Sequence, residues 1–247
     1  MKKFCLVLVA LLVLCIVEST YAQLRLGLMA GPNFSSVNSN ANNAVLAFTI
    51  GSFTGETELG LELSSRTLFG FGGVLDLPVG KNVTLRVGPQ YLQKGSKARA
   101  ESEKLADYTI TFLEIPAFIK YEFGTGPMRP SFLAGPTLGL VLSAKGFDFE
   151  EGDSEIDWKD FTKSPEFGLA FGGGLNFSAG ANVIFVEVRY ALGLNNIFNS
   201  QAFEDRLERE VENAVGEDVI VELEEIKIKT RGFQILAGVT FPLGGSN

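Results

Sequence analysis

The chain contains no histidine among its 247 residues, and its two cysteines, Cys5 and Cys15, lie near the N-terminus. The missing histidine excludes serine–histidine–aspartate and cysteine–histidine catalysis, as well as zinc sites with histidine ligands. A carboxylate pair such as Glu114 and Glu187 stays open as catalytic machinery, but neither a nucleophile elbow nor a metal motif accompanies it. We therefore expect no enzymatic activity, no cofactor and no bound metal.

Residues 1–22 have the pattern of a secretory signal peptide. Two lysines precede an apolar run over residues 4–17, and the small side chain of Ala22 fits cleavage before Gln23. The run is shorter than the roughly 20 residues that a transmembrane helix needs. We predict an exported mature domain over residues 23–247, with an uncleaved N-terminal anchor as the alternative.

The mature chain is predicted to be acidic and free of cysteine. The whole chain has 21 Lys and Arg against 29 Asp and Glu, and removing Lys2, Lys3 and Glu18 leaves 19 and 28, a net charge of −9. This charge argues against nucleic acid as a partner. Because disulfides are unavailable, we expect a closed, hydrogen-bonded sheet to supply stability.

The mature sequence lacks any apolar run of about 18 residues, so it predicts no transmembrane helix. Instead, stretches of about ten residues alternate between apolar and polar side chains and are separated by turn residues, as in membrane β-barrels. In the clearest stretch, Ile184, Val186 and Val188 alternate with Glu187 and Arg189. We predict eight strands, at residues 24–36, 66–78, 82–95, 107–123, 128–145, 163–178, 182–194 and 228–243.

The predicted connections alternate between short turns and long loops. The long ones cover residues 37–65, 96–106, 146–162 and 195–227. Outer-membrane barrels have short periplasmic turns and long external loops. We therefore expect an all-β, eight-stranded antiparallel transmembrane β-barrel in a Gram-negative outer membrane, surrounded by outer-membrane lipid and lipopolysaccharide and inserted by the barrel-assembly machinery. The alternative is a soluble periplasmic lipocalin-like ligand-binding barrel, which would have its apolar side chains inside.

One alternation carried through every predicted strand separates an apolar outer face from a charged lumen. Arg or Lys on the lipid face would cost roughly 2–4 kcal/mol near the bilayer midplane. Inside the barrel such groups can pair, and eight strands enclose only enough space for side chains. We predict a closed lumen without an open pore, filled by five cations and five anions: Arg25, Asp76, Arg86, Glu114, Lys120, Glu122, Arg129, Glu166, Glu187 and Arg189. Three Gly-Pro pairs, at residues 31–32, 88–89 and 135–136, predict a ring of bulges, because proline removes a ladder donor.

Two long loops carry the remaining candidates. The acidic loop 146–162 is either solvated or a site for a divalent cation, although its spacing does not match an EF-hand. In the last loop, Phe203, Leu207 and Val211 recur at helical spacing and predict a helix over residues 201–215. This helix either caps the barrel mouth or docks an envelope protein. The alternating residues 219–223 are expected to extend the last strand beyond the membrane.

Several segments also resemble a known family when taken in order. They are GLMAGPNFSSV (27–37), YLQKGS (91–96), TFLEIPAFIKYEF (111–123), RPSFLAGPTLGLVLSAKG (129–146), FGLAFGGGLNF (167–177) and VEVRYALGLNNI (186–197). Together they resemble the PorT-like outer-membrane β-barrel family, also described as an outer membrane protein beta-barrel domain. The resemblance implies an eight-stranded outer-membrane barrel with a structural or accessory role. The founding member is associated with a protein-secretion machine, so scaffolding of envelope or secretion machinery is one expectation.

Overall fold

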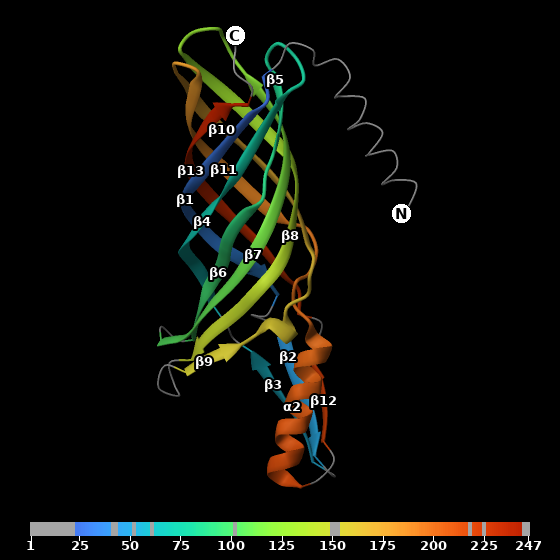
Figure 1. The fold of residues 1–247 in the computed structure, drawn as a ribbon. Helices are drawn as coiled ribbons and strands as arrows, with labels where there is room; N and C mark the ends of the chain where they lie inside the picture. Colours follow the sequence, from blue (N-terminus) through green and yellow to red (C-terminus); the bar gives the residue numbers. More distant parts are fainter. Residues whose placement is uncertain are drawn as a thin grey trace, which may run out of the picture.

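The computed structural model describes residues 23–40, 44–50, 53–59, 62–100, 103–148, 154–216, 219–223 and 226–243. Long antiparallel strands form a closed ring (Figure 1). The ring closes because its first strand pairs with its last strand as well as with the second strand of the ring. Its members in order are β1 (Arg25–Ser39), β4 (Glu62–Pro78), β5 (Val83–Val87) with β6 (Gln90–Ala100), β7 (Glu103–Glu122), β8 (Met128–Asp148), β10 (Glu166–Ala179), β11 (Asn182–Gly193) and β13 (Ile228–Pro242).

This ring confirms the predicted fold class, with β5 and β6 as two parts of one strand. All eight predicted strands are present, and the short turns lie at one mouth and the long loops at the other (Figure 1). Several strands continue further toward the long loops than predicted; β7, for example, begins at Glu103. We call the mouth with the short turns periplasmic and the other mouth external, because outer-membrane barrels are built with this polarity. The predicted signal peptide lies outside the described residues.

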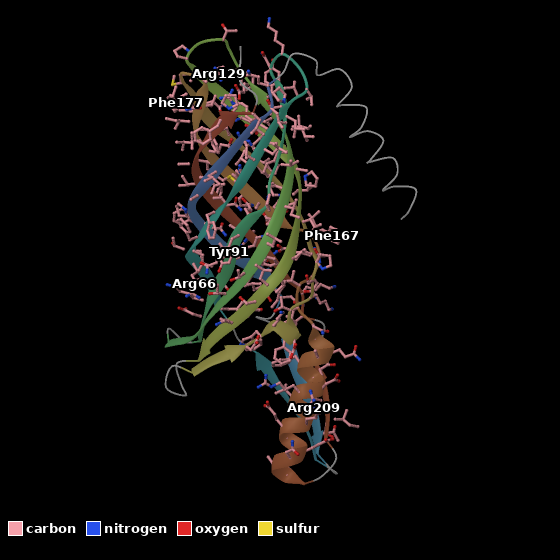
Figure 2. The ribbon with its side chains drawn as sticks, in the orientation of Figure 1. Arg66, Tyr91, Arg129, Phe167, Phe177 and Arg209 are labelled. Carbon is pink, nitrogen blue, oxygen red and sulfur yellow. The ribbon has the colours of Figure 1, made fainter. Side chains whose placement is uncertain are left out.

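The outer face of the ring is apolar, and its lumen is polar. Leu28 is 68% exposed, and Phe167 and Phe177 point away from the barrel (Figure 2). Further exposed apolar side chains of the strands are Leu26, Phe69, Phe71, Ile115, Ile119, Phe132, Leu169, Phe171, Ile184, Val186, Val188, Phe233, Ile235 and Phe241. In water this surface would be strongly unfavourable, whereas lipid accommodates it. The arrangement is the opposite of the one that a soluble lipocalin-like barrel requires.

The three Gly-Pro pairs interrupt the pairing of neighbouring strands. Gln90 resumes the strand that stops at Val87, so β5 and β6 are separated at residues 88–89. The pairing of β1 with β13 and of β7 with β8 is likewise interrupted where residues 31–32 and 135–136 lie. At each of the three glycines, a Cβ would overlap a carbonyl oxygen of the adjacent strand. Glycine therefore allows a close approach of two backbones beside each proline.

The long loops form a small module at the external mouth, as Figure 1 shows. The module contains a three-stranded sheet in the order β12 (Val219–Leu223), β2 (Ala44–Ile50), β3 (Phe53–Leu59), with α2 (Ser200–Val215) beside it. The expected extension of the last strand is wrong, because β12 pairs with β2 instead. Within the described residues, the pairing of β13 with β1 ends at Ile228, whose partner Ser39 is the last residue of β1. An extended strand would therefore lack hydrogen-bond partners, whereas the hairpin of β2 and β3 supplies them.

Two shorter elements complete the external mouth. The strand β9 (Ser154–Asp157) pairs with the end of β8, and the 3-10 turn η2 (Lys159–Phe161) follows it. α2 agrees with the helix predicted from the apolar spacing, starting one residue earlier. Among the described helices, none combines the length and the apolar character needed to cross a bilayer.

Candidate functional site

The lumen contains a charge cluster centred on Glu187, a side chain of β11 that is 0% exposed. Its carboxylate accepts hydrogen bonds from Arg86 and, at 2.6 Å, from Nη2 of Arg189, and Nζ of Lys120 lies 3.4 Å away. Arg86 also forms a two-point pair with Asp76, with both N···O distances at 2.7 Å. Buried charges are tolerated when they are paired and hydrogen-bonded in this way. We name these five residues the central cluster.

Aromatic rings fill the space between the charges of the lumen. The guanidinium of Arg86 lies 4.4 Å from the ring centre of Phe185, and that of Arg189 lies 5.0 Å from the ring centre of Phe118. Both rings are fully buried. Such cation–π contacts stabilise a desolvated cation on the side where it has no anion. In the middle of the lumen, buried charges and buried rings therefore lie in contact with one another.

A second cluster lies nearer the external mouth. Nζ of Lys94 is 2.7 Å from Glu114 and 2.6 Å from Glu166. Gln90 donates a hydrogen bond to Glu114, and Thr230 donates one to Glu166. Nearby, a cavity of only about 10 Å³ remains, which is the space of roughly one water molecule. Glu114 and Glu187 thus belong to different clusters and pair with different cations.

At the periplasmic mouth the lumen opens into a cavity of about 340 Å³, which we call the periplasmic cup. Arg129 pairs with Glu122 at 2.7 Å and donates to Ser178. Arg25 donates to the hydroxyl of Thr240 and to the carbonyl oxygen of Ala181. The cup is lined by Arg25, Asp76, Pro78, Gly80, Lys81, Asn82, Thr84, Lys120, Glu122, Gly124, Thr125, Arg129, Val183 and Thr240.

All ten charged residues predicted for the lumen thus lie inside the ring, and Lys94 joins them. Lys94 shares the even-numbered alternation of Thr84, Arg86 and Gln90 on the same interrupted strand, so the pattern that identified Arg86 also identifies Lys94. Together with Lys94, these described side chains are six cations and five anions. Asn176, whose amide oxygen accepts from Lys120 at 2.6 Å, is a further polar partner outside the predicted set.

The external mouth is covered by an aromatic cluster, which we call the mouth plug. Phe161 of η2 and Phe198 are buried there, and Trp158 and Phe203 pack against them. Next to the mouth plug, on the side of the barrel, Ile197 is 1% exposed and packs against Ile110 and Phe112 of β7 and Ala144 of β8. Apolar side chains therefore separate the lumen from the external module.

The candidate docking residues lie on α2, where the structure gives them contacts within the chain. Phe203 stacks on Trp158 with ring centres 6.1 Å apart, which makes it part of the mouth plug. Leu207 and Val211 are partly buried, and Glu208 of the same helix accepts a hydrogen bond from the backbone of Val221.

The acidic loop 146–162 lies partly outside the described residues. Within the ranges that the structure describes, no three Asp, Glu, His or Cys side chains gather as metal ligands would.

Comparison with known structures finds similar β-barrels of low sequence identity. Neisserial surface protein A is 15% identical with a TM-score of 0.43, and 88% of this chain covers 97% of that chain. The outer membrane protein OprG from Pseudomonas aeruginosa is 12% identical with a TM-score of 0.42 over 88% and 96% of the two chains. The attachment invasion locus protein Ail of Yersinia pestis is 12% identical with a TM-score of 0.38 over 89% and 100%.

A comparison with curated proteins finds no match. A family model described as "Outer membrane protein beta-barrel domain" matches residues 19–199, which is more than half of the chain. The match includes seven of the eight ring strands, from β1 to β11. With its closed antiparallel ring, its apolar outer face and this match, the chain belongs to the outer membrane protein beta-barrel family and resides in the outer membrane.

Proposed function

We propose that this outer-membrane barrel has a structural or accessory role: it conducts no solutes, it catalyses no reaction, and it holds its external module in place for an envelope protein. The observation that carries the proposal is that the lumen is filled while the long loops fold into a module. A pore would need an open path along the lumen. Here the central cluster and the mouth plug occupy that path.

The packing of the lumen supports a barrel without transport. Arg189, Lys120, Phe118, Phe185 and Leu133 are each at most 1% exposed, although they belong to three different strands. A solute crossing the barrel would have to break several buried ion pairs together. Breaking even one such pair typically costs about 3–5 kcal/mol.

The external module offers the surface for a partner. Ile220 of β12 is 59% exposed, and Val215 at the end of α2 is also exposed, on a helix that carries a mixture of acidic and basic side chains. The motifs shared with PorT-like proteins support a partner among the components of the envelope or of a secretion machine. The sheet and helix of the module give such a surface a fixed shape.

Crosslinking in intact cells tests the proposal. Wild-type protein and the variant Ile220→Lys are crosslinked, extracted in detergent and purified through a tag, and the captured envelope proteins are compared. We expect a partner that the wild type captures and Ile220→Lys loses. Ala181→Lys adds the same charge at the exposed periplasmic turn and serves as the control. Identical partners for the wild type and both variants would contradict docking on the module.

A further inference from the structure

The lumen charges are not evenly distributed along the barrel axis. The cluster at the external side holds one cation, Lys94, against the carboxylates of Glu114 and Glu166. Among the described residues, the periplasmic half, made up of the central cluster and the walls of the periplasmic cup, holds the five cations Arg25, Arg86, Lys120, Arg129 and Arg189 against the three anions Asp76, Glu122 and Glu187. Two positive charges are therefore unbalanced there, in a chain whose net charge is −8.

The excess is exposed to the cup. Arg25 points its guanidinium at neutral oxygens, those of Ala181 at 2.6 Å and Thr240 at 3.2 Å, and in the described part of the chain it has no carboxylate within ion-pair distance. On the opposite wall, Arg129 shares the single carboxylate of Glu122 with Lys120, whose Nζ is 3.6 Å from it. Lys81 adds a further cation at the exposed rim.

The surroundings strengthen this positive field. The strands are enclosed by lipid, and a cleft with an excess of one sign of charge between walls of low dielectric constant focuses its field on the opening. A positive field of this kind raises the local concentration of anions at the cup. Water alone fills the volume but does not neutralise the charge.

We propose that the periplasmic cup binds a small divalent oxyanion, of the class to which phosphate belongs, between Arg25 and Arg129. The cavity of about 340 Å³ accommodates such an ion with several waters, and the hydroxyls of Thr84, Thr125 and Thr240 are hydrogen-bond donors along its wall. The central cluster closes the floor of the cup, so the anion enters and leaves from the periplasm. This site does not depend on the proposed docking role of the external module.

Calorimetric titration of the refolded mature protein with inorganic phosphate tests the site. A sugar-based detergent is used, because its micelles contain no phosphate. We expect one ion per barrel, with binding weakened about ten-fold in Arg25→Gln because a charge-assisted pair is lost, and largely retained in Arg25→Lys. Arg209→Gln removes the same charge from α2, at the other end of the molecule (Figure 2), and is expected to bind like the wild type.

The results of these measurements separate the explanations. Absence of binding at millimolar phosphate overturns the proposal, and so does an equal loss of affinity in Arg209→Gln, which would indicate general charge attraction. If Arg25→Gln does not fold, Lys81→Gln replaces it, since Lys81 lies exposed in a turn; weaker binding in that variant supports the site and unchanged binding opposes it. Competition between free phosphate and added phosphatidic acid, whose headgroup is a phosphate monoester, identifies a lipid headgroup as the source of the same oxyanion, and lack of competition identifies a soluble one.

Discussion

Neutralising Glu187 is the most direct test of the lumen described above. The substitution Glu187→Gln keeps the size and shape of the side chain and removes its charge. Arg86, Arg189 and Lys120 then remain around an uncharged amide, with Asp76 as the nearest anion of the cluster. All three cations are at most 2% exposed, so water replaces the lost partner poorly.

The size of the effect follows from this burial. Removing one partner of a buried ion pair typically costs about 3–5 kcal/mol, because the other charge stays desolvated. The glutamine oxygen still accepts one hydrogen bond, so we expect a loss near the lower end, about 3 kcal/mol in the free energy of unfolding. Removing one cation as well, in Glu187→Gln with Lys120→Met, is expected to restore part of this loss.

Urea unfolding in lipid vesicles measures these differences, with the shift in gel mobility between folded and unfolded barrel as the signal. The control is Glu210→Gln on α2, which makes the same chemical change in a pair with Arg206 at 2.6 Å. That pair is 45% and 59% exposed, and exposed helical pairs contribute only about 0.3–0.5 kcal/mol. If Glu187→Gln costs no more than the control, the lumen is hydrated and the argument for a closed barrel fails.

Three further predictions concern the other parts of the molecule. Gly135→Ala is expected to destabilise the barrel by about 1–3 kcal/mol, since a Cβ would overlap the carbonyl oxygen of Ala117; Gly73→Ala, whose Cβ has 4.0 Å of clearance, is the control, and equal urea midpoints would refute the close approach. Phe203→Ser is expected to make α2 sensitive to limited proteolysis while the mobility shift of the barrel stays unchanged, and protection equal to that of the wild type would contradict the mouth plug. The wild-type protein in a planar bilayer is expected to show no conductance steps, and regular steps would show that the lumen is open.

Local alternation explains why so much of the barrel was predictable. The side chains of a strand point alternately to its two faces, so a single phase assigns Leu28 to the lipid and Arg25 to the lumen without knowledge of the partner strands. Lys94 follows the same rule, but the predicted lumen set does not include it. It lies next to residue 95, where the predicted strand ends. The strand in fact continues to Ala100, so Lys94 lies well within the barrel.

The external module was predictable only in part. The spacing of Phe203, Leu207 and Val211 is a local signal and located α2. The pairing of Val221 with Phe48 joins segments far apart in the chain, and nothing in the alternation of residues 219–223 distinguishes this partner from the last strand. The mouth plug is likewise built from separate loops, where Trp158 and Phe198 meet only after the barrel has brought their strands together.

The closure of the ring also constrains the order in which the protein folds. Arg25 pairs with Pro242, so the contact that closes the barrel joins two ends of the described chain. Contacts of such long sequence separation form slowly, because loop-closure entropy must be overcome first. Until the last strand arrives, β1 presents an open row of backbone donors and acceptors, which is a template for aggregation. We therefore expect the exported chain to depend on a catalyst that shields this edge until β13 can pair with it, which is the role expected of the barrel-assembly machinery.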